Sequence, residues 1–409
     1  MTAAERTRVT FRLDCGRMFC SGILESAATT FLLLIAVKHL ALGPLAKGLV
    51  ASGSSVGLLL SPLAVSWAAK RKLPTTILAS RVLLGGATCC GLMAAIDSVW
   101  VYIPAAIFGM AANWAIVPLM THVYQENYPG DRRGRLYAMS IMLRIIGAMS
   151  CGWAAGRLLD WKTTAYPVVL VGFATAFAVA AMLVRRIPSH PLPDAAGAHP
   201  LHALHFVRED RVFRQTLLVW MLMGFANLMM IPMRVEYLGN PRYGLARSAI
   251  QIALLTTVIP NLARLVMNPV WGWLFDRVNF FVLRMTLNLG FAIGIFAFFT
   301  SDSQIGLVLG AITFGVSSAG GDVAWGLWVT KFAPPGHVAD YMSVHTFFTG
   351  IRGVLAPLTA FQMVQRFSPP TLGWFSAGLI VAATFLLLPE ISRWKGTREQ
   401  EVATEEVVD

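Results

Sequence analysis

The sequence predicts an all-α, polytopic membrane protein with twelve transmembrane helices in two six-helix, pseudo-symmetric bundles. The first observation is composition: the residues AVILMFWYC make up 56% of the 409 positions, and Asp, Glu, Lys and Arg only 13%, about half of their usual share. The second is a series of long apolar stretches, and the third is a repeat that relates the two halves. A soluble core could not bury so much apolar surface, which excludes a soluble enzyme, a secreted disulfide scaffold and a disordered chain.

Twelve apolar stretches follow one another along the chain, each about as long as a transmembrane helix requires. They are continuously apolar and do not alternate with polar residues, which favours helices over a membrane barrel. The predicted spans lie near 17–38, 46–68, 75–96, 99–123, 134–158, 165–184, 214–236, 247–275, 281–300, 304–330, 339–364 and 371–389.

Glycines recur at matching places in the two halves of the chain. A shift of 206 residues places Gly109 on Gly315 and Gly147 on Gly353. Residues that allow close helix packing therefore repeat at the same depth, as expected for two units related by an axis along the membrane normal. The expected domains are an N-terminal six-helix bundle (1–185), a cytoplasmic linker (186–213) and a C-terminal six-helix bundle with a cytoplasmic tail (214–409).

The net charge of +12 has to be interpreted by where the basic residues lie. When tails and loops are assigned alternately to the inside and the outside, twenty of the 33 Lys and Arg, Arg17 among them, fall inside, six fall outside and seven lie within spans. This bias predicts cytoplasmic termini in a multi-pass protein of the inner or plasma membrane, and no nucleic-acid partner. The outside set is Lys38, Lys47, Lys162, Arg242, Arg247 and Arg366.

Two loop segments resemble signatures of the major facilitator superfamily. The segment 272–279 reads GWLFDRVN and is similar to the pattern G-x-L-x-D-R-x-G, with Asn279 in the last Gly place. The segment 128–135 reads YPGDRRGR and is similar to the family's Arg-Gly entrance to the fifth span. The resemblance implies a transporter that works by alternating access. The family's Arg-containing pattern in the fourth span, often linked to proton coupling, is absent around 108–114.

The resemblance further implies a gate at the cytoplasmic side. Asp276 would hold the eighth span against the start of the fifth by pairing with Arg133 or Arg135, in a contact that can be broken and remade. The alternative is a solvated loop charge that contributes little. The expected gating residues are Gly272, Asp276, Arg277, Arg133, Gly134 and Arg135.

Five charged residues fall near the membrane midplane, where a charge is costly unless it faces a partner or a wet cavity. They are Glu25, Arg144, Arg264, Asp322 and Arg352. In the layout that the family implies they surround one central cavity with a net charge of +1. Two interpretations stay open. Either the acids are held in structural ion pairs, or at least one arginine binds an anionic or polyhydroxylated solute while an acid serves as a coupling site.

Polar and aromatic residues on the spans that line this cavity are further candidates: Asn113, Trp114, Asn227 and Trp325. Asn offers a donor and an acceptor, and an indole ring can stack on a sugar or a base. Ordinary packing is the alternative for each. These observations predict a secondary active or facilitative transporter of a small polar solute, neutral or anionic. A polytopic membrane sensor or membrane-embedded enzyme without transport activity is the alternative.

We expect neither a cofactor nor a metal, because the chain carries no complete set of metal ligands and no nucleotide-binding motif. We therefore expect a protein that is not an enzyme. Its predicted partners are the small-molecule substrate, a coupling proton or cation, and the lipid bilayer, and we expect it to function as a monomer.

Overall fold

The computed structural model describes residues 2–130, 132–191, 204–331, 333 and 338–389, without the side chains of some helix residues, Asp276 among them. Every regular element in this part of the chain is a helix. Nine continuous helical stretches within it are long and apolar enough to cross a membrane. The chain thus has the all-helical architecture that its composition predicts.

The first half of the chain supplies six spans, three of which are interrupted or flanked by short helical turns. Its elements are α1 (Ala3–Ser26), η1 (Ala27–Phe31), α2 (Leu32–Lys38), α3 (Pro44–Arg71), α4 (Thr75–Ala95), α5 (Val99–Ala115), α6 (Val117–Asn127), α7 (Arg133–Trp161), η2 (Thr163–Ala165) and α8 (Tyr166–Arg185).

The second half supplies six more spans, preceded by one short helix. Its elements are α9 (His205–Glu209), α10 (Arg211–Gly239), η4 (Pro241–Tyr243), α11 (Ala249–Ala253), η5 (Leu254–Val258), α12 (Ile259–Arg277), α13 (Phe280–Thr300), α14 (Gln304–Leu327), η6 (Trp328–Lys331), α15 (Val338–Met363) and α16 (Pro369–Phe385).

The predicted spans agree with these helices to within four residues at all but one end, the start of the first helix. That helix begins at Ala3, whereas the predicted span begins at residue 17. Thr2 and Glu5 form a capping box, in which each side chain binds the other residue's backbone N–H. The polar residues that follow therefore continue the same helix, and Arg17, assigned above to the inside tail, lies within it.

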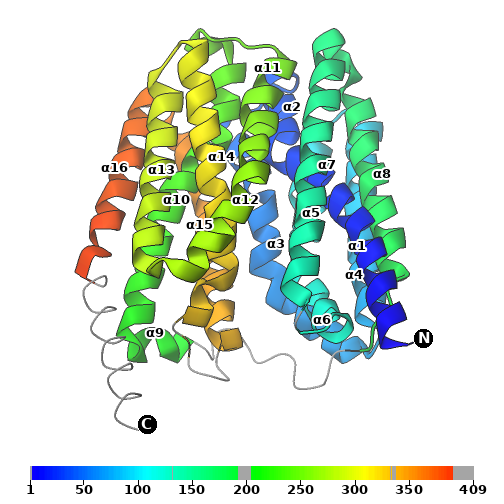
Figure 1. Ribbon diagram of the computed structural model, residues 1–409. Helices are drawn as coiled ribbons and strands as arrows, with labels where there is room; N and C mark the ends of the chain where they lie inside the picture. The colour runs from blue at the N-terminus through cyan, green and yellow to red at the C-terminus, as the bar shows by residue number, and fades with distance from the viewer. Residues whose placement is uncertain (1, 131, 192–203, 332, 334–337, 390–409) are drawn as a thin grey trace.

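The six spans of each half pack into a bundle (Figure 1). In the first bundle α1 packs on α7, α3 on α5 and α4 on α8. In the second bundle α10 packs on α15, and both α12 and α13 pack on α14. The crossing of α1 and α7 is close because a Cβ on Gly22 would overlap the carbonyl of Arg144, and one on Gly147 would overlap that of Phe19. Only glycine permits this approach.

The two bundles meet where α3 packs on α15, where α7 packs on α11, η5 and α12, and where α2 packs on α10. We call the side of the molecule with Ala3 and Arg71 the lower face, and the side with Pro44 and Trp161 the upper face, as in Figure 1. The π-helical turns η1 and η5 touch each other between the bundles. Such turns interrupt the regular hydrogen bonding of a long helix.

The hydrogen bonds and ion pairs that join described residues of the two bundles lie at the upper face or at mid-depth. At the upper face Lys47 Nζ lies 2.9 and 2.8 Å from the two carboxylate oxygens of Glu236, and both residues are buried. Lys38 donates to the carbonyl of Arg247 beside them. Lys47 and Lys38, assigned above to outer loops, therefore help to close the upper face.

The segment that follows α8 is attached to the first bundle. Thr75 Oγ1 donates to the carbonyl of His190 at 2.8 Å, and Thr76 Oγ1 donates to that of Ile187 at 3.0 Å. Asn127 Nδ2 donates to the carbonyl of Pro188 at 2.7 Å. On the other side of the linker, α9 is attached to the second bundle, where the ring of Phe206 lies 4.9 Å from that of Tyr341.

Candidate functional site

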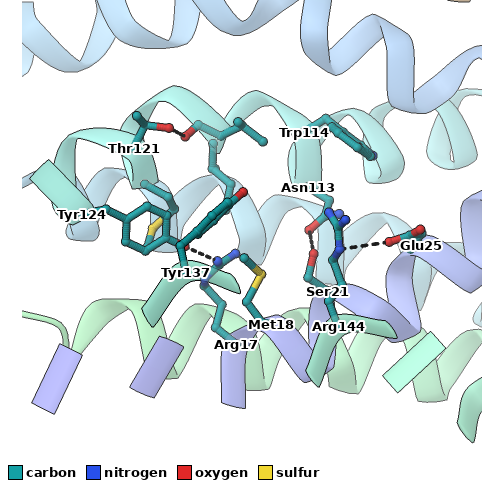
Figure 2. Close-up of a pocket in the computed structure, with 13 residues that line it drawn as sticks. Arg17, Met18, Ser21, Glu25, Asn113, Trp114, Thr121, Tyr124, Tyr137 and Arg144 are labelled. Carbon is teal, nitrogen blue, oxygen red and sulfur yellow. Dashed lines mark hydrogen bonds and ion pairs between the residues drawn. The ribbon is translucent and has the colours of Figure 1, made fainter. Parts of the chain in front are cut away.

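A cavity lies between α1, α5, α6 and α7 of the first bundle, with polar and aromatic side chains around it (Figure 2). Its position beside α1 brings it to the mid-depth contact with the second bundle. The lining residues are Arg17, Met18, Ser21, Glu25, Asn113, Trp114, Ile116, Val117, Met120, Thr121, Tyr124, Tyr137 and Arg144.

Four of the five predicted midplane charges form one chain of ion pairs at the inner end of this cavity. Arg144 Nε lies 3.2 Å from one oxygen of Glu25, and Arg264 Nη1 lies 2.7 Å from the other. Arg264 Nε then lies 2.5 Å from Asp322 Oδ2. The chain crosses from the first bundle to the second, and its two positive and two negative charges cancel.

Arg264 is the centre of this chain, because its Nε and Nη1 contact one acid each. Its guanidinium also donates to Asn261 Oδ1 at 3.2 Å, and only 10% of its side chain is exposed. Asp322 is the most exposed member, at 36% of its side chain. Arg264 therefore bridges Glu25 of the first bundle and Asp322 of the second.

Arg144 is held less completely. Its Nε is within ion-pair distance of Glu25 but is not aligned for a hydrogen bond. No described residue accepts from its two Nη groups, and 17% of the side chain is exposed to the cavity. Because an arginine presents its donors as a planar fork, these groups can bind a carboxylate, a phosphate or a pair of hydroxyls.

Asn113 and Trp114 lie across the cavity from Arg144 (Figure 2). Asn113 Oδ1 accepts from Ser21 Oγ at 3.3 Å, a bond that leaves its Nδ2 group as a donor. Helix α5 ends at Ala115, directly after these two residues. The first turn of the next helix, α6, contains Pro118, which lacks a backbone N–H. This break presents Asn113 and Trp114 to the cavity at the end of a helix.

Arg17 is a cavity residue that the sequence interpretation did not select. Its Nε donates to Asp14 Oδ1 at 2.8 Å and its Nη2 donates to the hydroxyl of Tyr124 at 2.6 Å. Tyr128, in the loop after α6, stacks on Tyr124, and burial and then the charge of Asp14 raise its pKa. Asp14 precedes Arg17 by three residues, a helical spacing that could have identified the pair.

Three predicted site residues lie elsewhere. Arg352, expected beside the other four charges, contacts the carbonyl of Trp220 inside the second bundle. Trp325 lies in the same region, with its ring 5.7 Å from that of His345. Asn227 is half-buried on α10, and its Oδ1 has no described partner. None of the three lines the cavity of the first bundle.

The predicted gate is described only in part, because the side chain of Asp276 lies outside the described residues. Arg133, its expected partner, donates from Nη2 to the carbonyls of Gln125 and Tyr128 at 3.2 and 3.3 Å. These carbonyls end α6, so Arg133 compensates the negative end of that helix.

The other expected gating residues have separate surroundings. The guanidinium of Arg277 lies 4.5 Å from the ring centre of Trp273. Arg135 is exposed at the start of α7. A Cβ added to Gly272 or Gly134 would meet nothing within 4 Å, so close packing does not require glycine at either place.

The sequence and the fold were compared with those of known proteins. The family model described as Major Facilitator Superfamily matches residues 17–357 and 229–407. No curated protein sequence matches the chain. Among solved structures, the nucleoside transporter NupG has a TM-score of 0.74 at 14% identity, over 93% of this chain and 98% of that one.

Two further solved structures are similar over nearly the whole chain. The human organic anion transporter MFSD10 has a TM-score of 0.66 at 15% identity, over 95% of this chain and 100% of that one. The xylose transporter XylE from E. coli, in an inward open conformation, has a TM-score of 0.69 at 12% identity, over 94% of this chain and 96% of that one. Identities this low show a shared fold and leave the solute open.

Proposed function

The chain belongs to the major facilitator superfamily, and from this premise we propose a secondary transporter that moves a small polar solute across the membrane by alternating access. The observation that carries the proposal is the chain of ion pairs from Arg144 through Glu25 and Arg264 to Asp322. It joins the two bundles beside a polar cavity, so a solute bound there can favour one arrangement of the bundles over another.

The contacts between the bundles support a state that is closed at the upper face. Lys47 and Glu236 form a buried ion pair there, and Lys38 donates to the carbonyl of Arg247 on the same face. We propose that the lower face is cytoplasmic, as the distribution of basic residues predicts. On this basis the proposed domains are the N-terminal bundle (1–185), the linker (186–213) and the C-terminal bundle with its tail (214–409). The two bundles would move as units.

We propose that the solute contacts Arg144, Asn113 and Trp114. The Nη groups of Arg144 would bind an anionic or hydroxyl-rich part of the solute, Asn113 Nδ2 would donate a further hydrogen bond, and the indole of Trp114 would stack on a ring. The similar structures are named as carriers of nucleosides, organic anions and xylose. Compounds of these three classes therefore form the first panel of solutes to test.

Uptake into proteoliposomes tests the proposal. The purified chain is reconstituted and offered radiolabelled nucleosides, pentoses and small organic anions, with and without a pH or sodium gradient. We expect saturable uptake of at least one compound, competition by its unlabelled form, and loss of uptake in Asn113→Ala and Trp114→Ala.

A matched control keeps the result specific. Arg157 lies on α7, as Arg144 does, but is exposed on its outer surface, so Arg157→Ala should transport as the unchanged protein does. If no compound of the three classes is taken up under any gradient, or if the Asn113 and Trp114 variants retain full uptake, the proposed site is wrong.

A further inference from the structure

A second group of buried polar residues lies inside the second bundle, away from the cavity of the first. Arg284 and Asn288 come from α13, His345 and Arg352 from α15, and Trp220 from α10. The exposed fractions of these five residues are between 0 and 9%. Interior polar groups are normally paired, so the partners of each one decide what the group can do.

Arg284 is 1% exposed and is held mainly by an aromatic ring. Its guanidinium carbon lies 3.6 Å from the ring centre of Trp220, and its Nη2 lies 3.4 Å from the sulfur of Met223. Its Nε and Nη1 atoms are buried without a hydrogen-bond partner among the described residues. The attraction of a cation to a desolvated indole is smaller than the cost of burying a charge.

Arg352 lies on the other side of Trp220 and donates from Nη1 to its backbone carbonyl. Its guanidinium occupies the place where a Cβ of residue 224 would be, and only the glycine at that position leaves room for it. Its Nε is buried without a described partner. Two positive side chains thus contact one residue, with no described carboxylate in an ion pair with either.

His345 and Asn288 add hydrogen-bonding groups to this pair. Both are 0% exposed. Neither ring nitrogen of His345 and neither amide atom of Asn288 has a described hydrogen-bond partner. Asn288 follows Arg284 by four residues on α13, which places both side chains on one face of that helix. The group therefore offers several donors and no described negative charge.

The other buried arginines of the described chain have different surroundings. Arg17 and Arg264 are paired with carboxylates. Arg234 has no described acid, and its Nε and Nη2 lack a described hydrogen-bond partner, but it is a single cation whose guanidinium lies 3.4 Å from the ring centre of Phe314 and 5.3 Å from that of Phe298. Arg284 and Arg352 differ because two cations are brought to one place, where their repulsion adds to the cost of burial.

We propose that Arg284, Arg352, Asn288 and His345 form a binding site for a compact anion within the second bundle, separate from the solute cavity of the first. The anion would accept from the guanidinium groups, from Asn288 Nδ2 and from the imidazole N–H. A halide ion and a carboxylate group share this chemistry. The site goes beyond the proposed transport function, because anion binding stabilises the second bundle whether or not a solute is moved.

Thermal unfolding of the purified full chain in detergent tests the site without any transport assay. The sodium salt of a bulky sulfonate without a carboxylate group, 2-(N-morpholino)ethanesulfonate, is replaced stepwise by sodium chloride or sodium acetate at constant ionic strength. We expect a saturable rise in Tm of about 2 °C or more, because a ligand that binds only the folded state stabilises it. The chloride and acetate arms distinguish an inorganic ion from a carboxylate.

Variants separate anion binding from general salt effects. Arg284→Met and Arg352→Met keep an unbranched, flexible side chain and remove the charge, so we expect each to weaken the apparent affinity for chloride or acetate at least about tenfold. Arg234→Met is the matched control, and it should keep the response of the unchanged protein. Without chloride or acetate, Arg284→Met should be at least as stable as the unchanged protein, because it removes an uncompensated charge.

Iodide quenching of tryptophan fluorescence gives a second measurement for any variant that folds poorly in the thermal assay. Iodide bound beside Trp220 should produce a saturable component that Arg284→Met lacks. The proposal is wrong if neither chloride nor acetate changes Tm in the unchanged protein. It is also wrong if all three Met variants keep the same response, or if Arg284→Met lowers Tm equally in every salt, as a purely structural cation over Trp220 would.

Discussion

The hydroxyl of Thr30 lies 2.7 Å from that of Thr257, and each residue belongs to a π-helical turn in a different bundle. The two turns, η1 and η5, therefore meet where long spans of both bundles depart from regular α-helix. Gly152 of α7 packs beside them, because a Cβ there would lie 3.0 Å from Thr257 Cγ2. The Thr30–Thr257 hydrogen bond thus joins the two bundles at their π-helical turns and helps to hold the upper face closed.

Thr257→Val should weaken that closure. The change removes the shared hydroxyl bond and keeps the branched shape, so we expect a loss of about 1 kcal/mol from the state closed at the upper face, a change in population of about fivefold. The measurement is the rate at which an impermeant maleimide labels a cysteine introduced at Ser248. Thr286→Val, on an exposed threonine of α13, is the control, and equal labelling rates in both variants would contradict the prediction.

Arg144→Lys should lower solute affinity and leave stability nearly unchanged. The lysine keeps the charge that faces Glu25 but cannot present two parallel donors. We expect a loss of affinity of about 10- to 100-fold, measured as the half-saturation concentration for uptake, with Tm close to that of the unchanged protein. Arg157→Lys on the same helix serves as the control. A large fall in Tm with unchanged affinity would assign Arg144 a structural role only.

Arg264→Gln should destabilise the protein by about 3 kcal/mol, because it leaves Glu25 and Asp322 with one cation between them. The double change of Arg264→Gln with Asp322→Asn removes one charge of each sign. We expect the double variant to be more stable than the single one, as measured by thermal unfolding. If the double variant is the less stable of the two, the charges do not act as one neutral chain.

Lys47→Met should shift the protein towards the state open at the upper face. Lys47 and Glu236 are 7% and 3% exposed, and breaking a buried pair costs about 3–5 kcal/mol. The same maleimide assay at Ser248 should report faster labelling. Adding Glu236→Gln removes the unpaired carboxylate and should restore part of the stability. Unchanged labelling in Lys47→Met would show that the pair does not hold the upper face closed.

Asp276→Asn should slow the exchange of solute across the membrane and leave the protein folded, because it removes the charge of the expected gate and keeps the size of the side chain. The measurement is the rate of equilibrium exchange in proteoliposomes. Arg157→Gln is the control, since Arg157 is an exposed residue of α7 outside the expected gate. Exchange at the unchanged rate in Asp276→Asn would rule out the gate.

The fold could be predicted from the sequence because a membrane span has a strong and continuous signal. The apolar runs located eleven of the twelve spans to within four residues at both ends. The first was placed too late because its opening turns are polar. Their helical state depends on the Thr2–Glu5 capping box and on packing, as when Thr7 donates to the carbonyl of Asn127 at 2.8 Å.

The candidate site could be predicted only in part. Depth along each helix identified Glu25, Arg144, Arg264 and Asp322, because charges in hydrocarbon are rare and need partners. Depth does not tell which way a side chain points around its helix. Arg352 has the same depth but faces Trp220 inside the second bundle, and its direction depends on the contacts of α15 with α10.

The attachment of 187–190 to the first bundle has a consequence for synthesis of the chain. Once the residues up to His190 have left the ribosome, every contact that fixes this segment is available, so we expect the first bundle to form before the second. At about 5–20 residues per second, the remaining 219 residues take roughly 10–40 s. In this interval Glu25 already has Arg144 beside it, and Arg264 later emerges with Asp322 in its own bundle. Each bundle can thus enter the bilayer with its central charges paired, before the two are joined.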